Sequence, residues 1–342
     1  MLSAPIIDQL NRLGQRREPF LFAFDYACQH PRIWTTSDLT SDEVWFSFNG
    51  RGNATNETAP DRPVWLEKSP MSFADYQPKF DRVLQAIRRG DSFLVNLSAP
   101  TPINTNLSLD EIYQSCQARY KFRLRNQFVC LSPEAFVQIE GNRMASFPMK
   151  GTRDASLPGA DARLLADPKE AAEHATIVDL IRNDLSQFAH KVWVERYRYL
   201  DRVDTNRGAL WQASSEIVAL LPPDWRDWLG SLLASLLPAG SISGAPKPST
   251  LRIINDVEQY NRGYYTGICG WFDGQQLDSG VMIRFVEQQA DGQFVFKSGG
   301  GLTARSDAQS EYQEVIDKIY FPLISDPATL PRNAAHLAAS AS

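Results

Sequence analysis

The sequence predicts an α+β fold, in which strands and helices follow one another in mixed order. Two kinds of segment support this prediction. Alternating or wholly apolar runs bounded by turn residues are typical of strands, and apolar residues at steps of three and four are typical of helices. Because these segments do not alternate strictly as strand, helix, strand, the order disfavours a doubly wound parallel sheet.

The first half of the chain contains four predicted strands and two predicted helices. A plausible Ser72 cap begins the helix at 72–89, and Gly90 ends it. Residues 50–63 are polar and rich in Gly, Asn, Thr and Pro, which indicates a loop. The strands are predicted at 20–26, 44–48, 92–97 and 128–131, and the second helix at 109–120.

A predicted hairpin at 136–143 opens the second half, and Lys150 follows its return strand. Residues 153–167 are predicted to form a loop. The next helix is strongly patterned, because Asp167-Pro168 supplies a cap and a proline at the first helical position. Further helices are predicted at 225–237, 249–258 and 307–320, and strands at 264–272, 279–288 and 293–297.

Composition limits the class of protein. The chain has 342 residues, which suits one large domain or two closely packed ones. Its formal charge of −5 gives no support to a nucleic-acid or anionic-membrane partner, and no apolar run is long enough to span a bilayer. The N-terminus lacks the pattern of a secretory signal, and the cysteines have no metal-type spacing. We therefore expect a cytoplasmic protein with reduced thiols.

Lys150 lies between Pro148 and the turn residues Gly151-Thr152. A glycine beside it would let a ligand approach the backbone closely. A lysine that is fixed and partly desolvated has an environment that lowers the pKa of its amine and makes it a nucleophile. The alternative is a surface lysine in a turn.

Two predicted helices each carry a pair of glutamates three residues apart. Glu170 and Glu173 lie near the start of one helix, and Glu311 and Glu314 lie on the last helix, with Lys318 one turn further on. Together these carboxylates suit a hard divalent cation such as Mg²⁺ with an anionic ligand. The alternative is two solvated acidic faces near helix N-termini, which the helix dipole favours.

Several segments have the character of anion receptors. The backbone N–H groups of Gly299, Gly300 and Gly301, and those of the turn before Ala245, are placed to bind a carboxylate or phosphate. Arg284, at the end of an apolar strand, is suited to clamp a carboxylate with two hydrogen bonds, unless it is a strand-end arginine in water.

A series of motifs in this order resembles the chorismate-utilising enzymes. These include component I of anthranilate synthase and of aminodeoxychorismate synthase, and the isochorismate and salicylate synthases. The resemblance covers roughly residues 72–322, and the motifs are SPE, PMKGT, KEAAEH with IVDLIRNDL, GSISGAPK, RGYYTGICGWF, VMIRF, GGGL and EYQEVIDK. At position 150 the chain resembles the aminodeoxychorismate branch, which has lysine there, whereas the other branches typically have alanine.

The resemblance implies a four-layer α/β/β/α fold with two orthogonally packed, mostly antiparallel sheets. Residues 1–71 would supply N-terminal strands to a shared β core, shortened relative to the family. Residues 72–322 would form the chorismate-binding catalytic domain. Residues 323–342, rich in Pro, Ala, Asn and Ser, would form a flexible tail.

The resemblance also implies roles for single residues. Lys150 would form a covalent adduct with chorismate, and Glu134 would be the general acid that protonates the departing hydroxyl. Mg²⁺ would be held mainly by Glu173 and Glu314, with support from Glu170 and Glu311. The remaining positions match ligand-contacting residues of the family: Arg284, Tyr265, Ser241, Thr152, Lys318 and Gly299–Gly301.

Two positions depart from the family pattern. Leu94 stands where water-using relatives place a lysine base, which argues against isochorismate or salicylate synthesis. Relatives that use ammonia commonly have glutamine there, so Leu94 leaves the ammonia path unexplained. Gln212 stands where several relatives have histidine. No counterpart of the tryptophan-regulatory segment is visible, so feedback inhibition by tryptophan is not expected.

The leading hypothesis is therefore aminodeoxychorismate synthase chemistry, serving 4-aminobenzoate and folate synthesis. No glutaminase signature is present, so ammonia would come from a separate glutamine amidotransferase subunit or from solution. The runner-up is anthranilate synthase component I. A third hypothesis is a catalytically silent chorismate- or metal-binding scaffold for an amidotransferase, against which Lys150, Glu134 and the four glutamates argue.

Overall fold

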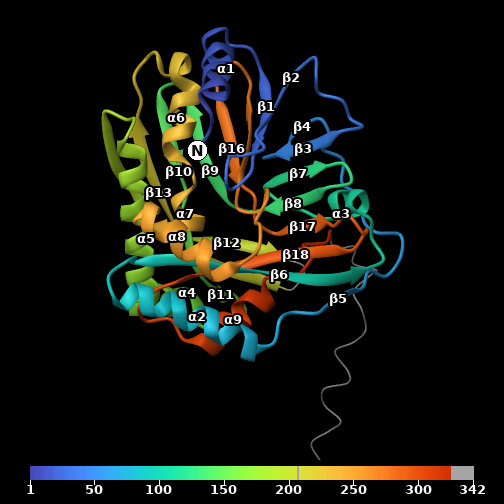
Figure 1. Cartoon of the computed structure of the whole chain (residues 1–342), viewed down its shortest axis with the longest axis vertical. Helices are drawn as coiled ribbons and strands as arrows, with labels where there is room; N and C mark the ends of the chain where they lie inside the picture. The colour runs from blue at the N-terminus through green and yellow to red at the C-terminus, as the bar shows by residue number, and fades with distance from the viewer. Residues whose placement is uncertain (206–207, 325–342) are drawn as a thin grey trace, which may run out of the picture.

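Two nine-stranded antiparallel sheets form the centre of the chain in the computed structural model, which describes residues 1–205 and 208–324. The strands of one sheet run across those of the other (Figure 1). Sheet A has the order β11 (Met149–Asp154), β13 (Gly208–Leu220), β10 (Arg143–Ser146), β9 (Ala135–Glu140), β16 (Leu277–Val281), β15 (Ile268–Phe272), β1 (Phe20–Phe24) and β2 (Arg32–Thr35), with β12 (Lys191–Thr205) paired to β13.

Sheet B carries the glycine-rich strand and lies against the C-terminal helix. Its order is β14 (Gly244–Ala245), β6 (Leu94–Thr105), β18 (Phe294–Leu302), β17 (Phe285–Gln288), β8 (Phe128–Ser132), β7 (Tyr120–Leu124), β3 (Val44–Phe48) and β4 (Arg51–Gly52), with β5 (Leu66–Lys68) paired to β6. The α+β fold class and its antiparallel sheets are therefore as predicted.

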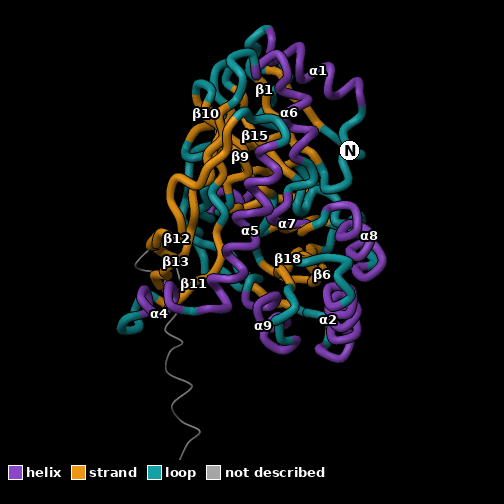
Figure 2. Tube along the Cα trace, turned by 90° about the vertical axis from the view of Figure 1, so that its left-hand side faces the viewer, coloured by secondary structure: helices purple, strands orange, loops and turns teal. Residues whose placement is uncertain are grey.

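Helices cover the outer faces of the sheets (Figure 2). Helices α1 and α6 pack on sheet A with α5, whereas α2, α8 and α9 share a buried cluster with β6 and β18. The helices are α1 (Ala4–Gln15), α2 (Phe73–Arg88), α3 (Leu109–Ser115), α4 (Ala160–Ala166), α5 (Pro168–Ser186), the 3₁₀ helix η1 (Trp225–Trp228), α6 (Leu229–Leu236), α7 (Gly240–Ser243), α8 (Lys247–Glu258) and α9 (Ala308–Asp317).

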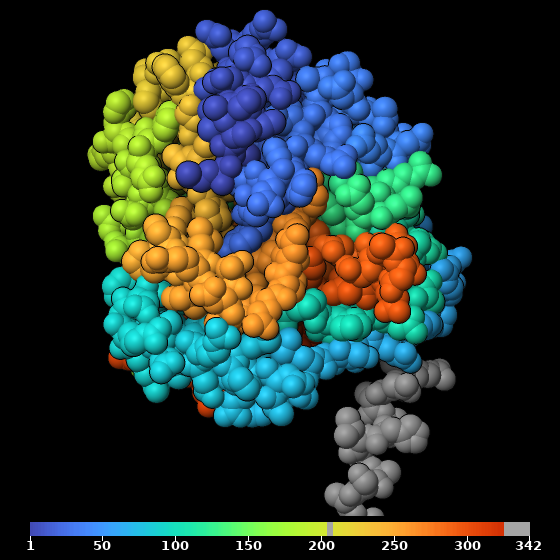
Figure 3. Space-filling view, in the orientation of Figure 1, coloured from blue at the N-terminus to red at the C-terminus, as the bar shows by residue number. Residues whose placement is uncertain are grey.

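An aromatic-rich core lies between the two sheets. Phe128 stacks on Phe285 with ring centroids 4.7 Å apart, and Phe46 stacks on Trp271 of the other sheet at 5.4 Å. The N-terminal residues belong to this same body, because β1 pairs with β15 in sheet A and β3 pairs with β7 in sheet B. Figure 3 shows the N-terminal segments, in blue, packed against later segments in orange.

Local sequence signals define several elements as predicted. The Ser72 side chain accepts a hydrogen bond from Asp75 N at 3.2 Å and caps α2. The Asp167 side chain accepts from Lys169 N at 3.0 Å and from Glu170 N at 3.3 Å, which fixes the start of α5. The hairpin of β9 and β10 is confirmed, with Arg143 opposite Glu140. These caps satisfy backbone donors that a helix N-terminus leaves free.

Other boundaries were wrong. The helix predicted at 109–120 ends at Ser115, and Tyr120 begins β7. The loop predicted at 153–167 contains α4, and α1, β12 and β13 were not predicted. The single strand predicted at 279–288 is two strands in different sheets, and Arg284, with a φ of 53°, lies between them.

The glycine segment of β18 and the end of the described chain differ from the prediction. Gly299–Gly301 lie inside β18 rather than beyond a strand. Of the predicted tail, Leu323 bridges to Cys116 and Ile324 N donates to Ser115 O at 2.8 Å, and the rest lies outside the described residues. Within the residues that the structure describes, no helix has the length and apolar character that a membrane span requires.

Candidate active site

Lys150 lies on β11 and is directed toward α5 and β18. Its Nζ atom is 3.0 Å from Glu173 Oε2, and its side chain is 25% exposed. A Cβ atom built on Gly301 would lie 3.8 Å from Nζ, which places the amine against the glycine-rich strand. The amine therefore faces the acidic helices rather than bulk solvent.

Gly151 makes this position possible. Its φ is +83°, and a Cβ atom there would lie 2.6 Å from Glu170 Oε2 and 3.0 Å from Leu164 Cδ1. The register of β11 against β13 shifts between Met149 and Thr152, so a bulge surrounds the lysine. Bulges of this kind re-aim a side chain, here the lysine that precedes the glycine.

We expect Gly151→Ala to destabilise the protein more than alanine at a comparable open glycine. Gly292 is the matched control, because its φ is +86° and nothing lies within 4 Å of an added Cβ. Gly292→Ala should lower the free energy of unfolding by about 1–2 kcal/mol from backbone strain alone. Gly151→Ala should lower it by about 1–3 kcal/mol more because of crowding. Urea denaturation measures both, and equal losses would contradict the close approach of Glu170 and Leu164.

The two glutamate pairs lie on α5 and α9 and meet at the same place. Glu173 is 8% exposed and Glu311 is 5% exposed. A Cβ atom on Gly300 would lie 3.4 Å from Glu311 Oε2 and 3.5 Å from Glu314 Oε1, so α9 presents its pair to β18 beside Gly301. The structure thus brings together the four glutamates and Lys150. The buried members, Glu173 and Glu311, do not lie on solvated acidic helix faces.

Lys169 is a further member of this cluster that the sequence analysis did not single out. Its Nζ is 3.9 Å from Glu173 Oε1, one helical turn on, and 4.0 Å from Glu311 Oε1. It therefore links α5 to α9. The one sequence signal for Lys169 was its i, i+4 spacing from Glu173. Such spacing is common on exposed helices, so it does not by itself indicate a site residue.

Burial and mutual charge set the protonation behaviour of the cluster. Burial raises the pKa of Glu170, with a further contribution from the Glu173 carboxylate. Burial also raises the pKa of Glu311. It acts in the same direction on Glu314, but the Lys318 ammonium outweighs it and the net pKa is lowered. The pKa values of the neighbouring carboxylates are therefore shifted in opposite directions within one site.

The predicted lowering of the Lys150 pKa was wrong. Burial alone would lower the pKa of Lys150, but Glu173, Glu314 and Glu311 outweigh it, and the net pKa is raised. A cation surrounded by carboxylates is stabilised in its charged form. The local sequence around Lys150 contains none of these carboxylates, which is why the prediction failed.

The four carboxylates have the chemical character of ligands for a hard cation, but they do not surround a single point where one could bind. Glu173 Oε1 is a buried oxygen that receives no hydrogen bond in the described part of the chain. All four candidate ligands are carboxylates, which magnesium prefers. In their present conformation, no three His, Cys, Asp or Glu side chains among the described residues are grouped to hold a metal ion. Side-chain movement around Lys150 and Lys169 would have to accompany binding.

Glu134 lies between β8 and β9, at one wall of a largely apolar cavity. Ser241 Oγ, on α7, donates to Glu134 Oε1 at 2.7 Å. Burial raises the pKa of Glu134, and the Ser241 hydrogen bond and the Lys318 charge oppose this rise in part. The cavity is lined by apolar residues of β9, α5 and α6 and by the carboxylate of Asp184. The pKa of Glu134 is therefore shifted in the direction that favours a general acid.

Lys318 connects the two acidic parts of the site. Its Nζ is 2.7 Å from Glu314 Oε1 and donates to Gly299 O at 2.7 Å. Arg284 Nη1 donates to Lys318 O at 2.6 Å, and its guanidinium lies over the Tyr320 ring at 4.6 Å. Arg284 is thus folded against the end of α9 and is not a strand-end arginine in water.

The glycines of β18 face this region from the sheet. Gly299, Gly300 and Gly301 pair with Ser98, Leu97 and Asn96 of β6, while the register with β17 stops at Lys297. One edge of the glycine segment is therefore outside the ladder and accessible to the Lys318 amine. The remaining predicted residues differ in placement: Tyr265 is 3% exposed with a raised pKa from burial, whereas Thr152 is exposed on β11 opposite Gln212.

Leu94 lines the space beside the lysine. A Cβ atom on Gly301 would lie 3.1 Å from Leu94 Cδ1 and 3.8 Å from Lys150 Nζ. The wall of the site next to the amine is therefore apolar on the β6 side.

Comparison with known proteins gives one family and a consistent set of relatives. The family described as chorismate binding enzyme matches residues 22–323, so the match begins in β1 rather than near residue 72. The chain is 48% identical over 318 residues to an uncharacterized PabA-like protein of Pasteurella multocida, covering 93% of this chain and 98% of that protein. It is 36% identical over 265 residues to an anthranilate synthase component 1 of Haloarcula marismortui, covering 72% of this chain and 52% of that protein.

A third relative and two solved structures complete the comparison. Aminodeoxychorismate synthase component 1 of Salmonella typhimurium is 32% identical over 285 residues, covering 78% of this chain and 61% of that protein. Anthranilate synthase component I of Streptococcus pneumoniae has a TM-score of 0.63 at 25% identity, covering 77% of this chain and 60% of that one. The menaquinone-specific isochorismate synthase of Escherichia coli has a TM-score of 0.67 at 15% identity, covering 92% and 79%, and shares the fold.

Proposed function

The chain belongs to the family of chorismate-binding enzymes, and from this premise we propose that it converts chorismate and ammonia to 4-amino-4-deoxychorismate. The observation that carries the proposal is the Lys150 amine, 3.0 Å from Glu173 and beside Gly301, in the centre of the site. A lysine in this place suits a covalent route, and the similarity to aminodeoxychorismate synthase component 1 of Salmonella typhimurium supports it.

The proposed reaction proceeds by two substitutions. The Lys150 ammonium first transfers a proton to a neighbouring carboxylate, and it regains this proton when it is later expelled. The free amine forms a bond to the ring carbon next to the carboxylate-bearing carbon, and the ring double bonds shift toward the carbon that carries the hydroxyl. In the same step the bond between the ring and its hydroxyl breaks, and Glu134 supplies the proton with which the hydroxyl leaves as water. Ammonia then bonds to the carbon that lost the hydroxyl, the bond to Lys150 breaks, and one proton of ammonia is released. The net exchange is hydroxyl for amino group, with water as the other product.

The remaining residues orient the substrate. We propose that Arg284, Tyr265 and the open edge of Gly299–Gly301 bind the carboxylates of chorismate, with Lys318 beside them. Magnesium would be held mainly by Glu173 and Glu314, with Glu170 and Glu311 in support, and when bound it would polarise the ring carboxylate. Ser241 holds the proton donor in place through its 2.7 Å hydrogen bond to Glu134.

The expected test is incubation of the full chain with chorismate, magnesium and ammonium, followed by mass spectrometry. We expect a product in which one hydroxyl of chorismate is replaced by an amino group, and none without an ammonia source. A second arm replaces ammonium with glutamine and a glutamine amidotransferase, which we propose as the partner that supplies ammonia. A third arm omits magnesium. Formation of anthranilate and pyruvate would favour the runner-up, and no consumption of chorismate would contradict both.

Anthranilate synthesis remains the second candidate because of one observation. The chain is 36% identical to an anthranilate synthase component 1 of Haloarcula marismortui over 72% of its length. That reaction also uses chorismate and ammonia but does not require a lysine adduct. The product, rather than substrate consumption, separates the two.

A further inference from the structure

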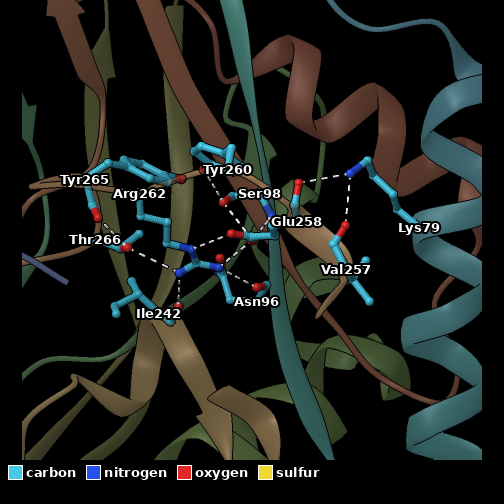
Figure 4. Close-up of polar contacts among 10 residues, drawn as sticks. All are labelled: Lys79, Asn96, Ser98, Ile242, Val257, Glu258, Tyr260, Arg262, Tyr265 and Thr266. Atoms are coloured by element: carbon cyan, nitrogen blue, oxygen red, sulfur yellow. Dashed lines mark hydrogen bonds and ion pairs between the residues drawn. The ribbon is translucent and has the colours of Figure 1, made fainter. Parts of the chain in front are cut away.

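Arg262 is a buried arginine with many polar contacts, although it is not among the proposed site residues. Its side chain is 2% exposed and lies between α8 and β15. Nε donates to Glu258 Oε2 at 2.8 Å, and Nη2 donates to Glu258 Oε1 at 2.6 Å. The remaining donors go to Ile242 O at 3.0 Å, Thr266 Oγ1 at 3.2 Å and Asn96 O at 2.8 Å (Figure 4). All five N–H groups of the guanidinium are therefore engaged.

The three acceptors outside Glu258 belong to three separate segments. Two of these segments carry a residue of the proposed site, and the third pairs with a strand that carries one. Ile242 follows Ser241, which donates to Glu134. Thr266 follows Tyr265. Asn96 lies directly opposite Gly301, which adjoins the Lys150 amine. The guanidinium of Arg262 thus holds together three segments next to the proposed site that are distant in the sequence.

Glu258 extends the same connection to β6. Its Oε1 atom accepts from Ser98 N at 2.7 Å and from Ser98 Oγ at 2.8 Å, and the Ser98 hydroxyl also lies 2.6 Å from Tyr260 OH. Lys79 of α2 donates to Val257 O at 2.9 Å and Glu258 O at 3.0 Å, which secures the end of α8. The pair is fully hydrogen-bonded, so its charges are compensated within the interior.

We propose that Arg262, held by Glu258, is a positioning residue for the chemical step. It acts through the α7 turn that carries Ser241, and so determines where the Glu134 proton donor sits relative to Tyr265 and the glycine segment of β18. This inference rests on the proposed function, since it assigns a role in turning over chorismate. Arg262 is not expected to contact the substrate, because its donors are all occupied by protein.

Lysine cannot replace this arginine. An ammonium has three donors on a flexible stem and no planar fork, so it cannot reach Glu258 and all three carbonyl and hydroxyl acceptors together. A displacement of about 1 Å in a catalytic group costs about a hundredfold in rate. Arg262→Lys should therefore lower kcat about 30-fold while KM for chorismate changes about threefold or less.

The matched control is Arg123, a second buried guanidinium at a distant place. Its side chain is 3% exposed, it binds Asp110 through Nε and Nη2 at 2.7 and 2.6 Å, and it donates to Asp42 O at 3.3 Å and Glu43 O at 3.5 Å. It joins β7 to α3, and none of these acceptors belongs to a proposed site residue or adjoins one. Arg123→Lys should lower thermal stability comparably and leave kcat within about twofold.

The deciding measurement is a double-mutant cycle on chorismate consumption, whichever product forms. If Arg262 acts through Ser241, then Arg262→Lys should cost about 30-fold in kcat in the wild-type background but about threefold in a Ser241→Ala background. Arg123→Lys should have the same small effect in both. The milder variant Glu258→Gln keeps an oxygen acceptor and should show the same dependence on Ser241 at smaller amplitude, which serves if Arg262→Lys folds poorly.

Each outcome decides something. Arg262→Lys could lower kcat equally in the wild-type and Ser241→Ala backgrounds, or no more than Arg123→Lys does. Either result would show that Arg262 only stabilises the fold. It would overturn the positioning role and leave the proposed function standing. A wild-type chain that consumes no chorismate under any condition would overturn the proposed function, and the positioning role with it. Strong coupling to Ser241 in both Arg262→Lys and Glu258→Gln supports the inference.

Discussion

Replacing Lys150 with alanine is expected to reduce formation of 4-amino-4-deoxychorismate at least a thousandfold, or to divert the enzyme to anthranilate. The amine is the only group of the protein that bonds to the ring in the proposed mechanism. A thousandfold corresponds to about 4 kcal/mol of transition-state stabilisation. The β6 side of the site offers no replacement nucleophile, because Leu94 there is apolar. Steady-state turnover of chorismate with product identification by mass spectrometry measures both outcomes.

Two further variants separate loss of the nucleophile from loss of the charge. Lys150→Arg keeps a cation next to Glu173 but cannot lose its proton, so it should be as inactive as Lys150→Ala while folding more stably. Lys169→Ala removes the other ammonium of the cluster, which lies 3.9 Å from Glu173 Oε1 and 4.0 Å from Glu311 Oε1. It should retain the amine substitution at a reduced rate. Unchanged product formation by Lys150→Ala would remove this lysine from the mechanism.

The raised pKa of Lys150 shows what a local sequence signal can and cannot predict. A proline, a lysine and a glycine in sequence predicted a constrained amine, and the φ of +83° at Gly151 bears this out. The sign of its pKa shift depends on Glu173 of α5 and on Glu314 and Glu311 of α9, which are distant in sequence. Pairing between such segments is a property of the whole fold and is not encoded in any short window.

Strand β6 illustrates the same limit for the fold. The predicted strand stopped at Leu97. Pro100 and Pro102 follow it, and proline cannot donate to a ladder. The strand nevertheless continues to Thr105. Its β18 side is paired throughout this stretch, but its other edge meets only β14 at Leu94–Val95 and β5 from Ile103 onward. The prolines therefore lie where one edge has no partner strand, which a sequence alone does not reveal.

The glutamate pairs and the caps were predictable for the opposite reason. Spacings of three residues on a helix and a cap before it depend on local geometry, so Glu170 with Glu173 and Glu311 with Glu314 could be placed on common faces in advance. That both faces meet beside Lys150 was expected only from the family resemblance. Arg262 lay within a quoted motif, yet its burial between α8 and β15 depends on contacts with four segments and carried no separate signal.

Glu134→Gln is expected to lower kcat by about 100–1,000-fold, because glutamine keeps the shape of the side chain but cannot transfer a proton. Chorismate binding should change little, since the amide still accepts the hydrogen bond from Ser241. A general acid works only when protonated. Because burial raises the pKa of Glu134, wild-type kcat should be highest below that pKa and should fall as the pH rises through it. In Glu134→Gln this fall should be absent.

Ser241→Ala tests the assignment of that pH dependence to Glu134. The Ser241 hydrogen bond lowers the Glu134 pKa, so its removal should move the falling limb of kcat to higher pH. Three other groups face Glu134. The charge of Lys318 also lowers the pKa of Glu134, burial raises the pKa of Tyr265, and Asp184 lies across the cavity. Lys318→Met should shift the limb in the same direction. A limb that stays in place in both variants, or a fully active Glu134→Gln, would assign the proton to another group.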